Sequence, residues 1–152
     1  MTGLGSDAGH VVEMPVAWIY QLRDGTLGSP SWNTAGYTGA GVKVGVIDVG
    51  FLGLDALLGS ELPAEVGAHC FVSVGTSSDA LSDCETRQKH GTAVAEALLD
   101  VAPDVTLYIA NPQSTFDLNE TVEWMISQGV TIINHSVGWG FEGPGDGTSR
   151  FN

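Results

Sequence analysis

The chain has 152 residues, a formal net charge of −13 and only two cysteines. This length normally folds as one compact domain, and a content of 43% hydrophobic and 15% charged residues is typical of a globular protein. The excess of carboxylates argues against a nucleic-acid partner, because phosphate binding depends on Lys and Arg. No apolar segment approaches the ~20 residues that span a bilayer, so we expect no membrane partner either.

The predicted elements begin after a Gly-rich stretch at the N-terminus. Residues 1–13 are predicted to be a flexible tail or the remnant of an upstream segment, and residues 14–152 the folded domain. In this domain, residues 31–35 predict one helical turn capped by Ser31. The glycines of residues 36–41 break that turn before the first strand.

A β-branched, nearly continuous apolar run predicts a strand over residues 42–47 that is covered on both faces. Further strands are predicted over residues 70–74, 105–109 and 130–133, with helices over residues 90–100 and 118–128. Alternating strands and helices joined by short crossovers predict an α/β fold, a doubly wound and mostly parallel sheet with helices on both faces.

The second predicted helix has local signals at both ends. Asp117 or Asn119 is expected to cap its N-terminus, and Gly129 is expected to end it. Its apolar stripe is predicted to consist of Val122, Met125 and Ile126.

Two side chains suited to acid–base chemistry stand at the ends of elements. Asp48 follows the first strand, and reactive groups of an open parallel sheet gather at the carboxyl ends of its strands. Phosphoryl acceptors and ribose ligands use the same position, so Asp48 alone does not decide the chemistry. His90 opens a helix whose next residues are small, and it is either a general base or an ordinary solvent-facing histidine.

Four spaced motifs occur in one order along the chain. They are Ile47-Asp48-x-Gly50, His90-Gly91-Thr92-x-Val94-Ala95, Ala102-Pro103 and Ile133-Asn134-x-Ser136-x-Gly138. Together with the glycine-rich lead-in before the first strand, they closely resemble the subtilase family of serine proteases, over about residues 32 to 140. The resemblance implies a subtilisin-like fold and peptide-bond hydrolysis by an Asp-His-Ser triad.

The resemblance also implies roles for individual residues. Asp48 would orient His90, and His90 would take the proton from a serine hydroxyl that attacks the peptide carbonyl. Ser136, Val137 and Gly138 match the family's substrate-binding segment, whose backbone pairs with an extended peptide and borders the pocket for the residue before the cut.

The sequence departs from the family pattern at three places. Val49 stands where Ser or Thr is usual, so the Asp48 carboxylate is expected to lose one orienting hydrogen bond. Ala93 and Glu96 stand where the helix motif commonly has His and Gly. The nucleophile motif and the oxyanion Asn are not recognisable, because no helix-forming residues follow Ser149 in Gly147-Thr148-Ser149. We therefore expect an N-terminal portion of a catalytic domain, incomplete at the C-terminal side of the sheet and inactive alone.

Two other functions fit parts of this pattern. A pseudoprotease-like peptide-binding module would hold an extended strand in the same groove without cutting it. Gly39-x-Gly41 beside a strand suggests dinucleotide binding, but these glycines precede their strand, whereas the dinucleotide fingerprint follows its strand.

Cys70 and Cys84 either form a disulfide or remain free thiols, and the loop-like sequence between them favours the disulfide. We expect a secreted, extracellular protein whose signal peptide is not present. No zinc-like cluster appears and no cofactor is expected to be required, although the resemblance implies structural calcium at a site we do not locate. Expected partners are an extended peptide or protein substrate, the remaining C-terminal part of the protease domain, and a second copy bound through an exposed sheet edge.

Overall fold

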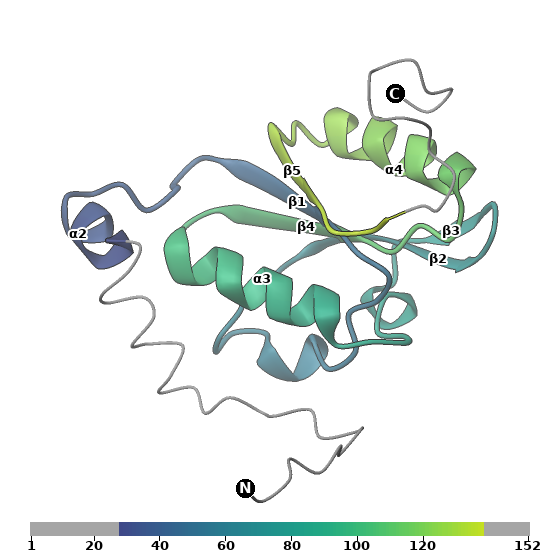
Figure 1. Cartoon of the computed structure of the whole chain (residues 1–152), viewed down its shortest axis with the longest axis horizontal. Helices are drawn as coiled ribbons and strands as arrows, with labels where there is room; N and C mark the ends of the chain where they lie inside the picture. Colours follow the sequence, from purple (N-terminus) through teal and green to yellow (C-terminus); the bar gives the residue numbers. More distant parts are fainter. Residues whose placement is uncertain (1–27, 139–152) are drawn as a thin grey trace, which may run out of the picture.

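The computed structural model describes residues 28–138 of the chain, so the predicted tail over residues 1–13 and the sequence around Ser149 lie outside the described residues. The described part forms a five-stranded sheet in the order β3-β2-β4-β1-β5 (Figure 1). Its strands are β1 (Lys43–Ile47), β2 (Gly67–Ser73), β3 (Thr76–Ser78), β4 (Thr106–Ala110) and β5 (Ile132–His135). Only β3 runs antiparallel to its neighbour, so the predicted mostly parallel sheet is confirmed.

Helices cover both faces of this sheet, as predicted. The covering helices are α3 (His90–Val101) and α4 (Thr115–Ser127), and the chain also forms the short helix α2 (Ser29–Thr34) and the 3-10 turns η1 (Asp55–Leu57) and η2 (Leu81–Asp83). Figure 1 shows α3 below the strands and α4 above them, on opposite sides of the sheet. Within residues 28–138, no helix combines the length and the apolarity needed to cross a membrane.

The alternation of side chains along β1 divides the core into two layers. Val44 and Val46 pack with the residues of β4 that face α3, while Ile47 packs with Met125 of α4 on the opposite face. Gly45 also points toward α4, where a Cβ would overlap with the Met125 side chain. The strand is therefore buried on both faces, which explains its nearly continuous apolar sequence.

The start of α4 differs from the sequence prediction. Ser114 caps the helix, because its Oγ accepts a hydrogen bond from the Asp117 backbone N–H at 3.2 Å, so the expected cap at Asp117 or Asn119 is wrong. Asp117 lies in the first turn, and its buried carboxylate accepts the backbone N–H groups of Gly75 and Gln113. The side chain that resembles a cap in the sequence thus fastens the β2–β3 hairpin to α4.

The rest of α4 follows the prediction only in part. Gly129 ends the helix with a φ of +78°, and Met125 is fully buried. Ile126, however, is 64% exposed, so the predicted apolar stripe is wrong at that residue. The cap predicted at Ser31 is also wrong: α2 begins at Ser29, since Pro30 has the φ of a first helical turn.

A disulfide joins Cys70 of β2 to Cys84, as the sequence favoured. Both cysteines are fully buried, and the bridge fixes β2 to the segment that leads into α3. The short strand β3, with the sequence Thr-Ser-Ser, was not predicted because it carries no apolar alternation.

Candidate active site

The fold brings Asp48 and His90 together, although 42 positions separate them in the sequence. Asp48 lies just beyond the carboxyl end of β1 and His90 is the first residue of α3. His90 Nδ1 lies 2.6 Å from Asp48 Oδ2. The Asp48 side chain is fully buried, whereas that of His90 is 56% exposed. Within the described residues, this is the only hydrogen bond of the His90 side chain, so Nε2 has no partner there.

The orientation of the Asp48 carboxylate is fixed through both of its oxygens. Oδ1 accepts the backbone N–H of Val49 at 2.7 Å, and Oδ2 faces His90. A backbone amide therefore orients the carboxylate where the valine side chain has no hydroxyl to offer. An acceptor on Nδ1 favours the tautomer in which Nε2 has a free lone pair, so the arrangement suits Nε2 for removing a proton from a neighbouring hydroxyl.

Two glycines allow the Asp48 loop and the start of α3 to approach each other. The Gly91 N–H donates to the Gly50 carbonyl at 3.1 Å. A Cβ on Gly91 would lie 2.7 Å from that carbonyl oxygen and 2.8 Å from Asp48 Cβ, and a Cβ on Gly50 would overlap with the Thr86 carbonyl oxygen. Gly50 and Gly91 are therefore both needed for the close approach of the Asp48 loop to the start of α3.

Further backbone bonds hold the two segments in register. The Phe51 N–H donates to the Cys84 carbonyl at 2.9 Å, and the Leu52 N–H donates to the Gln88 carbonyl at 3.0 Å. The bridge from Cys84 to Cys70 extends this attachment to the sheet. The disulfide thus fixes the base of the segment that carries His90.

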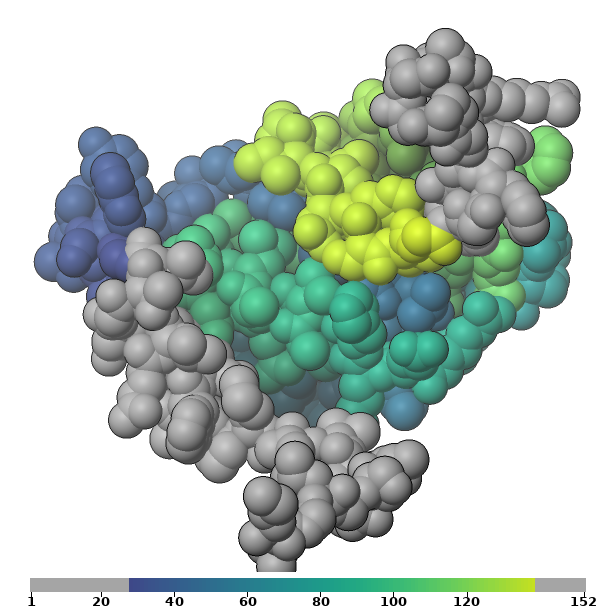
Figure 2. Space-filling model, in the orientation of Figure 1, coloured from purple at the N-terminus to yellow at the C-terminus, as the bar shows by residue number. Residues whose placement is uncertain are grey.

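The segment Ser136–Gly138 lies at the same edge of the sheet as the Asp48–His90 pair. The Ser136 N–H donates to the carbonyl of Ile47 at 3.0 Å, which places the segment beside the residue that precedes Asp48. Figure 2 shows this yellow end of the described chain on the surface next to α3. The Ser136 hydroxyl accepts a hydrogen bond from Asn134 at 2.7 Å and, within residues 28–138, forms no hydrogen bond with His90.

Three polar residues near this edge were missed from the sequence. Asn111 is buried directly after β4, where it accepts the Phe71 N–H at 2.6 Å. Gln113 donates to the Phe71 carbonyl at 2.5 Å and accepts a hydrogen bond from the Arg87 guanidinium. The argument that singled out Asp48, a polar residue at the carboxyl end of a parallel strand, applies equally to Asn111 and would have found it.

Glu96 lies on α3, at one of the positions where the sequence departs from the family pattern. Burial raises the pKa of the Glu96 carboxyl above its usual value of 4.5, and the nearby negative charge of Glu61 raises this pKa further. Within the described residues, no three His, Cys, Asp or Glu side chains are placed to hold a metal ion. The calcium site therefore remains a prediction.

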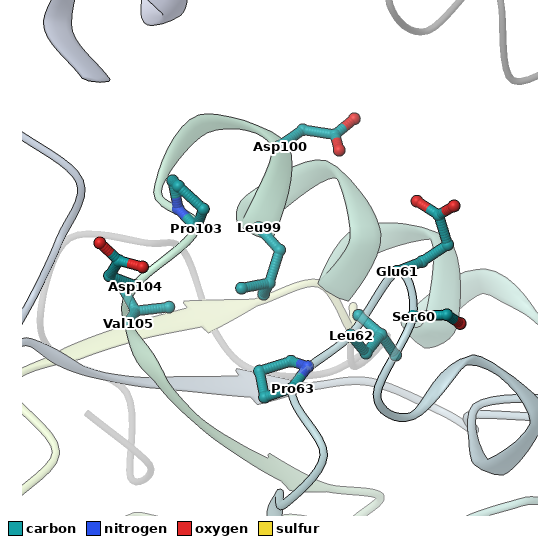
Figure 3. Close-up of a pocket in the computed structure, with 9 residues that line it drawn as sticks. All are labelled: Ser60, Glu61, Leu62, Pro63, Leu99, Asp100, Pro103, Asp104 and Val105. Carbon is teal, nitrogen blue, oxygen red and sulfur yellow. The ribbon is translucent and has the colours of Figure 1, made fainter. Parts of the chain in front are cut away.

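A cavity of about 450 Å³ lies away from the Asp48–His90 pair, at the opposite end of α3. Leu62, Leu99 and Val105 line its apolar part, and the carboxylates of Asp100 and Asp104 stand near its rim (Figure 3). Neither Asp48 nor His90 lines this cavity. Its volume alone does not make it the candidate active site, because no acid–base pair is present in it.

The buried histidine His69 has a different environment from the half-exposed His90. His69 of β2 directs Nδ1 to Asp79 at 3.3 Å and Nε2 to Glu120 at 3.2 Å. Its ring stacks on Trp124 with centroids 5.0 Å apart and meets the edge of Phe71 at 5.2 Å. Both nitrogens of this histidine are therefore engaged.

A comparison with known protein families identifies the family of the chain. The model of the subtilase family matches residues 39–150, which include Asp48, His90 and the Ser136–Gly138 segment. No curated protein matches the chain. The match covers most of the chain and confirms the resemblance inferred from the four motifs, so the chain belongs to the subtilase family.

Proposed function

We propose that the protein is a serine endopeptidase in which Asp48 and His90 are the acid and the base of an Asp-His-Ser triad. The observation that carries the proposal is the 2.6 Å contact between a fully buried carboxylate and one nitrogen of a half-exposed imidazole. A subtilase with this pair is expected to hydrolyse peptide bonds.

In this mechanism His90 Nε2 removes the proton of a serine hydroxyl as the oxygen attacks the peptide carbonyl. The resulting imidazolium is stabilised by the Asp48 carboxylate, and the same proton then passes to the leaving amine. Water hydrolyses the acyl-enzyme in a second pass through the same groups. We propose that the nucleophilic serine and the oxyanion Asn come from outside residues 28–138 and that Ser149 is not the nucleophile.

The substrate is proposed to be an extended peptide bound along the Ser136–Gly138 segment. The bond from the Ser136 N–H to Ile47 supports this placement, because it holds the segment at the carboxyl end of β1, beside Asp48. A strand added to this segment would bring its peptide carbonyls close to His90.

We further propose that the protein acts outside the cell. The Cys70–Cys84 disulfide supports this location, since structural disulfides are typical of oxidising compartments. The proposed partners are calcium, the rest of the protease domain and a second copy bound through the sheet edge. These proposals are based on the family resemblance and on the position of β5 at the edge of the described sheet.

A serine-directed fluorophosphonate probe and a mixture of fluorogenic peptides test this function. Both are applied to the 152-residue chain and to the product of the complete open reading frame. We expect the second to be labelled and active, and Asp48→Asn to lower its kcat by about 10⁴, because a triad that loses its acid holds the histidine in the wrong tautomer. Asp104→Asn, at an exposed aspartate beyond the opposite end of α3, is the matched control and should leave kcat unchanged.

The outcomes separate the alternatives. We expect the 152-residue chain alone to remain unlabelled, because none of its residues matches the family's nucleophile. Labelling of Ser149 or Ser136 in that chain would show that our assignment of the nucleophile is wrong. If neither form is labelled but both bind peptides, and binding survives His90→Ala, the protein is a peptide-binding module and not a protease.

A further inference from the structure

The few basic residues of this acidic protein are unevenly placed. Lys43, Arg87 and Lys89 are the Lys and Arg residues of the described part. Lys43 lies at the amino end of β1, where its Nζ donates to the Gln128 carbonyl at 2.7 Å. Arg87 and Lys89 lie three residues and one residue before His90, are exposed, and form no salt bridge with any described carboxylate. Arg87 and Lys89 therefore place two cations beside the candidate active site of a chain whose formal net charge is −13.

The backbone of Arg87 is unusual. Its φ of +67° makes it the one non-glycine residue of residues 28–138 with a positive φ. The Gln88 N–H closes a tight turn over it by donating to the Thr86 carbonyl at 2.9 Å. That carbonyl packs against Gly50, two residues after Asp48. Left-handed backbone at a bulky residue persists only where the surrounding structure imposes it, and such residues cluster at functional sites.

The Arg87 side chain contacts a residue that follows β4. Its Nη2 donates to Oε1 of Gln113, which is itself bound to the Phe71 carbonyl at 2.5 Å. Gln113 follows β4 and the Ser136–Gly138 segment follows β5, and these strands flank β1 on opposite sides. A peptide paired with the Ser136–Gly138 segment would therefore have the Arg87–Gln113 bridge along its other side.

We propose that Arg87 selects substrates with an acidic side chain among the residues that precede the cleaved bond. This inference rests on the endopeptidase function proposed above. The guanidinium is held in place by Gln113, and its remaining N–H groups are available to a carboxylate in a bidentate geometry. The acidic residue lies on the amino side of the cut, because that part of the peptide pairs with the Ser136–Gly138 segment.

The test uses the product of the complete open reading frame as the enzyme. It compares kcat/KM between matched peptides that carry Asp or Asn at each of the three positions before the cut. At one of these positions we expect the wild-type enzyme to prefer Asp roughly tenfold, the effect of one charge-assisted hydrogen bond in a partly exposed site. Arg87→Asn should remove the preference, since Asn tolerates a positive φ and is neutral. Arg87→Glu should reverse the charge preference, so that a peptide with Lys at this position is cleaved better than one with Asp. Raising the salt concentration should reduce it.

Lys89→Gln is the matched control, since it removes the neighbouring cation and should leave the Asp-to-Asn ratio nearly unchanged. An equal ratio in the wild type and in Arg87→Asn would overturn the inference while leaving the proposed function standing. Equal losses on Asp and Asn peptides would overturn it as well, because Arg87 would then serve only to position its loop. Cleavage of no peptide by any form would overturn the proposed function itself.

Discussion

His90 and His69, both within residues 28–138, contact carboxylates, and they differ in which ring nitrogens remain free. His90 uses one ring nitrogen, on the buried Asp48, and its side chain is 56% exposed. His69 uses both nitrogens, on Asp79 and Glu120, and its side chain is 11% exposed. Only the first arrangement leaves a nitrogen that can accept a proton from another group.

The carboxylates differ as well. Asp48 is fully buried and bound on both oxygens, so its orientation is fixed. Asp79 and Glu120 are 83% and 50% exposed, and water screens their attraction for His69 to less than ~1 kcal/mol each. His69 is therefore held mainly by its packing against Trp124 and Phe71, and the comparison separates a histidine placed for chemistry from one placed for stability.

The largest expected effect on stability comes from removing the buried ring. His69→Ala should lower the free energy of unfolding by about 2 kcal/mol and Tm by roughly 5 °C, because it leaves a cavity between two aromatic rings. His90→Ala should cost about 1 kcal/mol or less, since water can replace a half-exposed side chain and solvate Asp48. Urea and thermal unfolding of both variants measure the difference.

A milder variant tests the cause assigned to the His69 effect. Glu120→Gln keeps an oxygen acceptor for the ring and for Ser77, whose hydroxyl lies 3.0 Å from Glu120 Oε1, but removes the charge. Its cost should stay under about 1 kcal/mol. If Glu120→Gln destabilises the protein as much as His69→Ala does, the ion pairs and not the ring packing hold His69.

The next effect concerns the contact that makes His90 different. Gly91→Ala places a methyl group 2.7 Å from the Gly50 carbonyl oxygen and should push α3 away from Asp48. We expect a cost of about 1–2 kcal/mol in stability and a loss of roughly 10- to 100-fold in kcat/KM. In the 152-residue chain, the low-field proton NMR signal of His90 Nδ1–H should weaken or shift.

Gly45→Ala is the matched control for that variant. Its methyl group would overlap with Met125 on the α4 side of the sheet, away from the Asp48–His90 pair. It should lower stability by a similar amount and leave the His90 Nδ1–H signal unchanged. A shifted signal in Gly45→Ala would mean that any loss of packing disturbs the pair, and that the close approach at Gly91 has no special role.

What the sequence could predict depends on how local the signal is. Strand periodicity is a local signal, so the parallel sheet was predictable from it, whereas the pairing of Asp48 with His90, 42 positions apart, was predicted from the resemblance to the subtilase family. His69 and Arg87 carry no such signal, because their partners Glu120 and Gln113 come into reach only through the order of the strands. The cap of α4 was mistaken for a related reason: the buried carboxylate of Asp117 binds the distant hairpin.

The smallest expected effect on stability concerns Glu96, whose carboxylate lies near the carboxylate of Glu61 and not near a histidine. The pKa of Glu96 is raised above 4.5 by burial and by Glu61, so the folded state binds this proton more tightly than the unfolded state does. The contribution of Glu96 to stability is therefore fully present below about pH 4.5 and is lost as the pH rises through the folded-state pKa. Glu96→Gln should remove this loss.

At neutral pH we expect Glu96→Gln to be more stable than the wild type by less than about 1 kcal/mol, since the carboxyl is only partly buried and water screens it. At acidic pH, where Glu96 is protonated in both states, the difference should vanish. Urea unfolding across this range measures it, with the exposed Glu65→Gln as the control. A gain that persists unchanged at acidic pH would come from packing or helix propensity. The charge of Glu96 would then contribute nothing to the stability difference.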